Sequence, residues 1–278
     1  MATHTVEKIG GTSMSDYESV RDNIVLGSET DLYQRMFVVS AYGGITNELL
    51  EHKKSGNPGV YAMFANAIDD DGWINKFDLL VRELHAINQK LFGQGDELEE
   101  ANTFIDERLG EARQCLLDLQ SICQHGHFAL EVHLDTVREM LASIGEAHSA
   151  WNMARLLRRD GVNARFVDLT GWSDDKHISL DERINEALKD LNLEKELPIV
   201  TGYAHTRLGL MSSFDRGYSE MTFSRLAVLS NAREAVIHKE FHLSSADPRV
   251  VGEEKAVPIG RTNFDVADQL ANLGMEAI

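Results

Sequence analysis

Positive charge is scarce in this sequence. Its 278 residues include 27 lysine and arginine residues against 45 aspartate and glutamate residues, which gives a formal net charge of −18. Non-specific binding to nucleic acid depends on cationic surface that neutralises phosphates. An anionic membrane surface likewise attracts basic segments. We therefore expect neither nucleic acid nor a membrane among the partners of this protein.

Cysteine and long apolar runs are also rare. The two cysteines, Cys115 and Cys123, match no zinc-site or CxxC spacing and provide no disulfide framework. We expect both to be buried thiols in a reducing compartment. No apolar run approaches the roughly 20 residues that span a bilayer, and the N-terminus has no apolar signal core. The sequence thus predicts a cytoplasmic protein.

Strand-like and helix-like segments alternate along most of the chain. Strand patterns occur at residues 3–9, 36–41, 164–169, 197–204 and 235–238. Helical patterns begin near residues 15 and 45 and recur at 181–191, 221–231 and 265–274. This alternation predicts an α/β fold with a mainly parallel sheet. Residues 51–142 differ, because the apolar spacing at 75–91 and 98–119 predicts an all-helical insertion.

A glycine pair follows the first predicted strand, in the sequence V-E-K-I-G-G-T-S at residues 6–13. Two glycines at a strand end let backbone N–H groups approach an anion closely, and the start of a helix adds partial positive charge there. Lys8 can reach phosphate oxygens from the end of the strand. The same pattern also fits a tight turn with a surface lysine, and spacing alone does not choose between the two.

A second glycine turn follows the second predicted strand, in S-A-Y-G-G-I-T-N at residues 40–47. Neighbouring parallel strands that end in such turns would place both at one sheet edge, where open α/β sheets bind ligands. Ser40 and Thr46 would supply hydroxyl groups at that edge. The alternative is an ordinary turn in which Thr46 is the N-cap of the next helix.

These two turns and three later segments resemble, in order, the motifs of aspartate kinases. Residues 8–13 are similar to K-F-G-G-T-S and residues 40–47 to S-A-x-x-G-x-T-[ND]. The segment S-I-G-E-A-H-S at 143–149 resembles a helix start with G-E-x-x-S, F-D-R-G-Y-S-E at 214–220 resembles L-G-R-G-G-S-D, and A-D-P-R-V-V at 246–251 resembles T-A-D-P-R-[VI]-V. Residues 237–245 look most like the aspartate kinases associated with ectoine biosynthesis.

The resemblance implies a fold, an activity and its ligands. The fold would be a three-layer α/β/α sandwich of amino-acid-kinase type, with the helical insertion over the substrate site. The activity would be ATP-dependent phosphorylation of the side-chain carboxylate of L-aspartate to 4-phospho-L-aspartate, with Mg²⁺ on the phosphates. L-aspartate and ATP would be the small-molecule partners, and a homodimer is left open.

The resemblance also assigns residue roles, carried over motif by motif. The expected catalytic residues are Lys8 and Glu220, the latter an acid that orients the lysine. The expected substrate-binding residues are Ser40, Thr46, Glu146, Arg216 and Ser219. The expected nucleotide-binding residues are Lys8, Gly10, Gly11, Lys239, Ser244 and Arg249. No metal site made of protein ligands alone is expected.

Several of these residues also have purely structural explanations. Ser143 and Glu146 match the pattern of a capping box at a helix start. Arg216 fits a surface arginine in a loop, and Glu220 fits a first-turn acid favoured by the helix dipole. Only the joint match to ordered motifs favours the functional interpretation.

On the substrate side two departures from the family pattern bear directly on the expected site. Glu220 replaces an aspartate, which keeps the charge and lengthens its reach. Tyr218 replaces a glycine, which would put a bulky ring where backbone approaches the ligand.

The nucleotide side departs further. His238 and Lys239 replace a threonine and an aspartate, Ser244 stands where a tyrosine is usual, and Glu276 stands where a later lysine is usual. The motif residues expected to bind aspartate are therefore largely retained, whereas several of those expected to bind ATP are replaced. One hypothesis is that Lys239 takes over a phosphate contact.

We expect residues 1–278 to form a single catalytic domain without the small regulatory domains of the family. Feedback inhibition by an amino acid should then be missing. Two other functions remain open: a kinase of another small acid on the same fold, and a catalytically silent relative that binds an amino acid or nucleotide.

Overall fold

The computed structural model describes residues 4–27, 32–66, 72–239, 244–246, 248–252, 254–261, 263 and 265–266. Within them the chain divides into two compact units, residues 1–237 and 238–278. The strands are β1 (Thr5–Ile9), β2 (Arg35–Val39), β3 (Ala164–Val167), β4 (Leu197–Thr201) and β5 (Glu234–His238). Each strand begins within two residues of the predicted start. The predicted ranges extend up to three residues beyond the observed strand ends.

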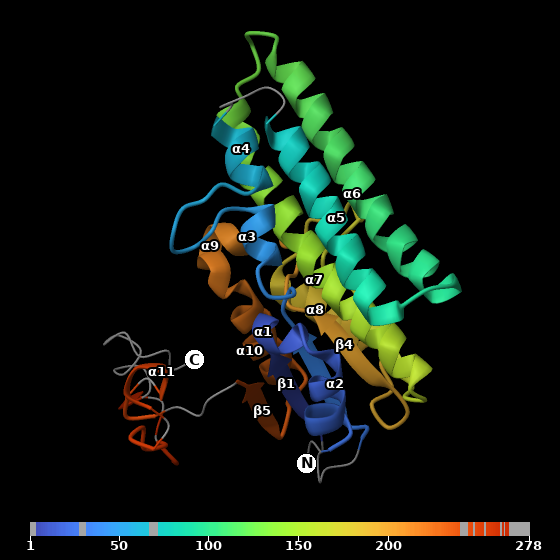
Figure 1. Cartoon of the computed structure of the whole chain (residues 1–278), viewed down its shortest axis with the longest axis vertical. Coiled ribbons are helices and arrows are strands. Elements are labelled where there is room, and N and C mark those ends of the chain that lie inside the picture. The colour runs from blue at the N-terminus through green and yellow to red at the C-terminus, as the bar shows by residue number, and fades with distance from the viewer. Residues whose placement is uncertain are drawn as a thin grey trace. The chain divides into compact units, whose positions relative to one another are not determined.

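The helices of the first unit surround this sheet (Figure 1). They are α1 (Gly11–Met14), α2 (Tyr17–Val20), the π-helix η1 (Arg21–Val25), α3 (Ile45–Leu49), α4 (Val60–Asn66), α5 (Gly72–Phe92), α6 (Asp96–Cys123), the 3₁₀ helix η2 (Leu130–His133), α7 (Leu134–Arg159), α8 (Leu180–Leu188), α9 (Leu210–Phe214), the 3₁₀ helix η3 (Asp215–Gly217) and α10 (Tyr218–Leu229). In the second unit, α11 (Pro248–Val251) is described.

The five strands form one sheet in the order β3-β4-β2-β1-β5, and the β1–β2, β2–β4 and β3–β4 pairs are parallel. All residues of β1, β2 and β4 are buried, as expected for parallel strands covered on both faces. Helix α7 packs on β2, β3 and β4, whereas α10 packs on β1 and β2 beside α8. The predicted three-layer α/β/α fold is confirmed.

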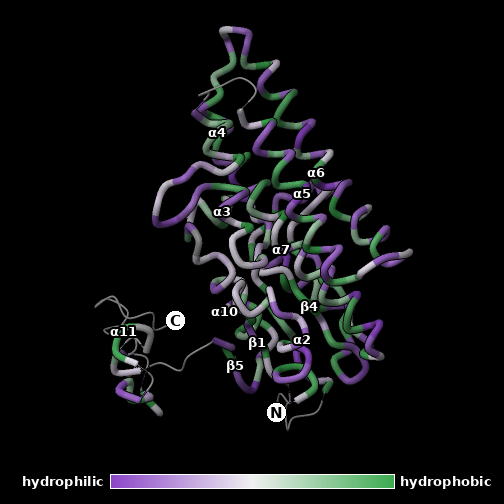
Figure 2. The backbone as a smooth tube through the Cα atoms, in the orientation of Figure 1, coloured by the Kyte–Doolittle hydropathy of each residue, from purple (hydrophilic) through white to green (hydrophobic). Residues whose placement is uncertain are grey.

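The region predicted as a helical insertion contains α4, α5 and α6, and Figure 1 shows α5 and α6 as a long pair that extends away from the sheet. Figure 2 shows hydrophilic and hydrophobic residues alternating along this pair, and mostly hydrophobic residues in β4. Among the described residues, no helix is both long enough and apolar enough to cross a membrane.

Two local predictions are wrong, and a third falls largely outside the described residues. Cys115 is exposed and Cys123 half-buried, because α6 is an outer helix that buries only the side carrying residues such as Ala112 and Leu116. The first helix begins at Gly11 instead of residue 15 and is interrupted before α2. Most of the helix predicted at 265–274 lies outside the described residues.

Candidate active site

Three parallel strands end side by side and form the base of the site. In the sheet register Ile9 pairs with Val39, and Val39 pairs with Thr201. The residues that follow these strand ends therefore meet at one edge of the sheet, where open α/β sheets bind their ligands. The predicted meeting of the two glycine turns at one edge is confirmed, and β4 contributes a third strand end.

The two glycine turns touch each other directly. A Cβ atom on Gly11 would lie 2.5 Å from the carbonyl oxygen of Ala41, so only glycine fits at this position. Ser15 links the same two turns, because its hydroxyl accepts a hydrogen bond from the Gly43 N–H at 3.0 Å and donates one to the Gly11 carbonyl at 3.2 Å. Sequence analysis did not single out Ser15, which belongs to no motif.

The residue after β4 is also required to be small. A Cβ atom on Gly202 would lie 2.8 Å from both the Ser219 hydroxyl and the Val39 carbonyl oxygen. Gly202 therefore lets the first turn of α10 approach the sheet edge. Ser219 occupies the space that this glycine leaves.

Lys8 is buried and ion-paired, not a surface lysine. Its side chain is 5% exposed, and its ammonium lies 2.9 Å from a carboxylate oxygen of Glu220. Glu220 lies in the first turn of α10 and is 26% exposed, so it faces the opening more than Lys8 does. The pair is the arrangement expected if Glu220 orients the lysine, although the helix dipole also favours an acid at this position.

Glu146 lies beside this pair, in the middle of α7, and is 1% exposed. Burial raises the pKa of its carboxyl to about 8, and the negative charge of Glu220 adds to the rise. The Ser219 hydroxyl, the charge of Lys8 and the Tyr203 backbone N–H act in the opposite direction. Ser219 donates to its Oε1 at 2.6 Å, while its buried Oε2 has no hydrogen-bond partner within the described part of the chain.

Charge is unbalanced within this group. When Glu146 is ionised, one cation among the described side chains, Lys8, serves two carboxylates, Glu146 and Glu220. A buried polar oxygen without a partner is costly, and the cost falls when a donor arrives. The arrangement therefore favours a ligand that brings a positively charged donor to Glu146.

Hydroxyl groups line the space between α7, α10 and the sheet edge. The Ser40 and Ser219 hydroxyls lie 3.5 Å apart, and the Ser149 hydroxyl donates to the Ser40 carbonyl at 2.8 Å. The structure thus brings five of the predicted site residues together: Lys8, Ser40, Glu146, Ser219 and Glu220.

Two structural explanations raised by the sequence are wrong. Ser143 and Glu146 lie in the interior of α7, which begins at Leu134, so they form no capping box and no helix start. Thr46 is not an N-cap, because α3 begins at Ile45 after Gly44 in the left-handed conformation at φ +91°. Thr46 instead lies in the first turn of α3 and is half-buried.

Tyr218 does not stand in the way of a ligand as the sequence suggested. Its side chain is 3% exposed and packs edge-on against the ring of Tyr203, with the ring centres 5.6 Å apart. The replacement of glycine by tyrosine therefore adds core packing under α10.

The remaining predicted residues are placed less completely. Arg216 lies in η3, directly before α10, but its side chain is outside the described part of the chain. Lys239, Ser244 and Arg249 lie in or at the start of the second unit. Lys239 is exposed, Ser244 forms an isolated bridge with Pro258, and Arg249 lies in α11 with its side chain not described. Glu276 is outside the described residues.

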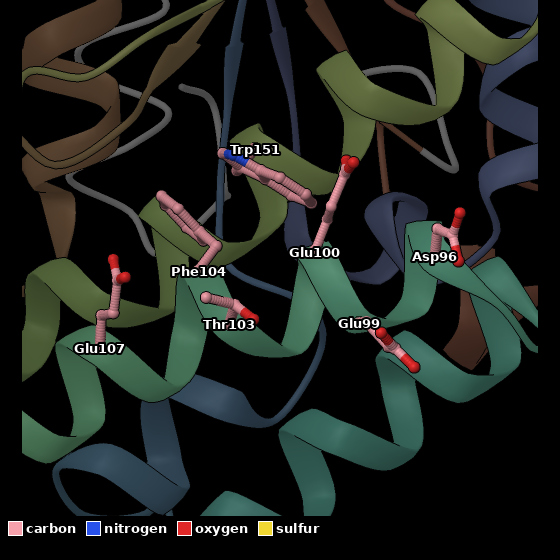
Figure 3. Close-up of a pocket in the computed structure, with 7 residues that line it drawn as sticks. All are labelled: Asp96, Glu99, Glu100, Thr103, Phe104, Glu107 and Trp151. Carbon is pink, nitrogen blue, oxygen red and sulfur yellow. The ribbon is translucent and has the colours of Figure 1, made fainter.

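A hollow of about 520 Å³ lies elsewhere, between α6 and α7 (Figure 3). Phe104 and Trp151 stack with ring centres 5.0 Å apart, and the other lining residues are Asp96, Glu99, Glu100, Thr103 and Glu107. Four carboxylates would repel a nucleotide or an acidic substrate. None of the predicted site residues lines this hollow.

Comparison with known proteins decides the family. Residues 4–278 match the amino acid kinase family, which is nearly the whole chain. The chain belongs to the amino acid kinase family. This amino acid kinase is 55% identical to the aspartate kinase Ask_Ect of Stutzerimonas stutzeri (strain A1501), over 99% of the chain and 58% of the relative. It is 26% identical to an aspartokinase of Candida albicans, over 98% of the chain and 51% of the relative.

Solved structures show the same fold. The structure of E. coli aspartokinase III in complex with aspartate and ADP (R-state) matches this amino acid kinase with a TM-score of 0.67 and 22% identity, over 99% of the chain and 57% of that protein. The same enzyme with lysine and aspartate (T-state) matches with a TM-score of 0.62 and 23% identity. The chain spans a little over half the length of the relatives it matches.

Proposed function

We propose that this amino acid kinase transfers the γ-phosphoryl group of Mg-ATP to the side-chain carboxylate of L-aspartate, giving 4-phospho-L-aspartate. The buried Oε2 of Glu146, which has no partner among the described residues and lies beside the Lys8–Glu220 pair, carries the proposal. The names of the similar proteins, aspartate kinases and aspartokinases, support it. The amino acid kinase fold alone would not choose among acidic substrates.

The difficulty of this reaction lies in charge, because a β-carboxylate has a reference pKa near 3.9 and is already ionised at neutral pH. It needs no general base, but it must approach the anionic γ-phosphate. Alignment and positive charge therefore supply the catalysis. Lys8 is the buried cation that bridges the approaching groups, and Glu220 holds its ammonium in place.

Recognition of the amino acid follows from the charge imbalance at Glu146. The α-ammonium of aspartate would donate hydrogen bonds to Oε2 of Glu146. It would also bring a positive charge to Glu146 and Glu220, which share Lys8. Arg216 would bind the α-carboxylate through a bidentate pair of hydrogen bonds. The hydroxyls of Ser40, Thr46 and Ser219 would complete the contacts to the substrate.

The first glycine turn has room for a phosphate group of the nucleotide. A Cβ atom on Gly10 would meet no neighbour within 4 Å, so open space adjoins the backbone there. Gly10, Gly11 and Lys8 would hold phosphate oxygens. Lys239, Ser244 and Arg249 would supply further nucleotide contacts.

Magnesium would neutralise charge on the phosphates. No group of three or more potential metal-ligating side chains exists within the described residues. Mg²⁺ commonly keeps several waters and binds through substrate phosphates, so such a cage is not required.

The direct test traps the acyl phosphate. The protein is incubated with Mg-ATP, L-aspartate and hydroxylamine, and formation of aspartyl hydroxamate is measured. We expect hydroxamate with L-aspartate and at least tenfold less with L-glutamate at equal concentration. A higher yield with glutamate, or none with either acid while ATP binds, would reject the aspartate kinase assignment.

A further inference from the structure

The segment that carries Arg216 has little structure of its own to hold it. It consists of α9, which is five residues long, and the 3₁₀ turn η3. Isolated helices of this length are unstable in water. Something outside the segment must fix its position.

Glu139 of α7 provides this anchor. Its side chain is buried, with the residue 7% exposed, and its two carboxylate oxygens accept four hydrogen bonds. The donors are the Tyr203 hydroxyl at 2.6 Å, the Leu210 N–H at 3.1 Å, the Ser212 N–H at 2.9 Å and the Ser212 hydroxyl at 3.3 Å. Three of the four donors belong to the first turn of α9.

The chain makes room for this carboxylate at Gly209. A Cβ atom there would lie 2.4 Å from Oε1 of Glu139, and the backbone has φ +77°. Both features favour glycine. The close approach of α9 to Glu139 is therefore built into the backbone.

The neighbouring residue of α7 holds the other end of the segment. Arg138 lies 3.2 Å from a carboxylate oxygen of Asp215 and 2.9 Å from one of Glu51. Asp215 replaces the glycine of the L-G-R-G-G-S-D motif and has φ +46° and ψ −132°, a conformation that glycine favours. Two adjacent residues of one helix thus fix both sides of the segment that leads to Arg216.

The same helix face also carries Glu146. Glu139 and Glu146 are seven residues apart, which is two turns or about 10.5 Å along the axis. Tyr203 lies next to both, since its hydroxyl donates to Glu139 and its backbone N–H lowers the pKa of Glu146. Helix α7 therefore sets the distance between Glu146 and the Arg216 segment.

We propose that Glu139 is a positioning residue for recognition of the amino-acid substrate, acting through α9 on Arg216. This inference rests on the proposed function, in which Glu146 binds the α-ammonium and Arg216 the α-carboxylate. Both groups flank one carbon atom of aspartate, so their spacing must be held closely. A displacement of about 1 Å at such a site costs up to about 100-fold.

The test compares Glu139→Gln with Glu182→Gln. Glu182 is the matched control, because it too accepts hydrogen bonds from a serine hydroxyl and a backbone N–H at a helix start, in the capping box of α8. For Glu139→Gln we expect KM for aspartate to rise at least tenfold while KM for ATP stays within twofold. For Glu182→Gln we expect neither constant to change. Equal rises in both constants, or an unchanged KM for aspartate, would overturn the inference.

Hydrogen exchange tests the anchor without kinase activity. We expect the Leu210 and Ser212 amides to exchange at least tenfold faster in Glu139→Gln and at the wild-type rate in Glu182→Gln. Unchanged exchange would overturn the anchor alone, whereas a wild type that forms no aspartyl hydroxamate overturns the proposed function. If Glu139→Gln fails to fold, Tyr203→Phe is the substitute, because it removes only the hydroxyl that donates to Glu139. We then expect KM for aspartate to rise two- to threefold.

Discussion

Two buried glutamates on one face of α7 behave differently. Glu139 accepts four hydrogen bonds from Tyr203 and the start of α9. Glu146, two turns later, has one oxygen bonded to Ser219 and one that no described residue hydrogen-bonds. Both carboxylates are almost fully removed from water.

The difference separates architecture from recognition. A carboxylate whose lone pairs are filled by its own protein fixes the elements that supply the donors. Burying a carboxylate oxygen without a partner costs stability. A ligand that donates a hydrogen bond to that oxygen removes this cost, and the gain contributes to binding. Substitutions at each glutamate, or at the groups that contact it, test this difference.

The largest expected effect comes from the cation that accompanies Glu146. Lys8→Met removes the positive charge that bridges the two anionic substrates, and we expect hydroxamate formation to fall by about 10³-fold, in line with losses of a single charge-stabilising group. Lys176→Met is the control, because Lys176 forms an exposed ion pair with Glu186. Activity within tenfold of wild type in Lys8→Met would remove Lys8 from the mechanism.

The next effect is a pH dependence of aspartate binding. The pKa of Glu146 is raised to about 8 by burial, so below that pH the free protein holds this carboxyl protonated. Binding of the ammonium needs the ionised form and releases a proton. The apparent Kd for aspartate should therefore rise about tenfold for each pH unit below 8, or about 100-fold at pH 6.

Calorimetry in two buffers of different ionisation enthalpy measures both the Kd and the proton release. Glu146→Gln should bind aspartate weakly at every pH, and its flat profile separates the titration of this group from that of the ligand. A wild-type Kd that is constant from pH 6 to pH 8 would show that Glu146 does not receive the ammonium.

The sheet edge was predictable from the sequence because its physics is local and repetitive. A strand followed by a glycine turn and a helix, occurring twice, predicts parallel neighbours whose carboxyl ends coincide. This logic brought Lys8 and Ser40 to one edge, as the register of β1 and β2 confirms.

Helix α7 was harder to predict. It buries residues on several sides, so its apolar spacing loses the one-sided period that marks a surface helix. The local pattern Ser143-x-x-Glu146 then looks like a helix start although it lies inside the helix. Glu139 was missed for a related reason, since its donors Tyr203, Leu210 and Ser212 lie 64 to 73 residues away in the chain.

The smallest effect is also the sharpest contrast, because the two glutamates should respond to the same substitution with opposite signs. Glu139→Gln removes a charged acceptor from four donors and should lower the free energy of unfolding by about 1–3 kcal/mol. Glu146→Gln should raise it at alkaline pH. In the folded state the carboxyl of Glu146 has a pKa of about 8, above its ordinary value of 4.5, so folding favours the protonated form.

The wild type therefore keeps this stability at acidic pH and loses it as the pH rises from about 4.5 through about 8. A glutamine cannot ionise, and its unpaired amide costs about 3 kcal/mol at every pH. Glu146→Gln should therefore be less stable than the wild type by about 2 kcal/mol at pH 5 and more stable by about 2 kcal/mol at pH 9. Urea unfolding at both pH values, without aspartate, measures the difference. Equal destabilisation by both substitutions at pH 9 would show that Glu146, like Glu139, serves the architecture.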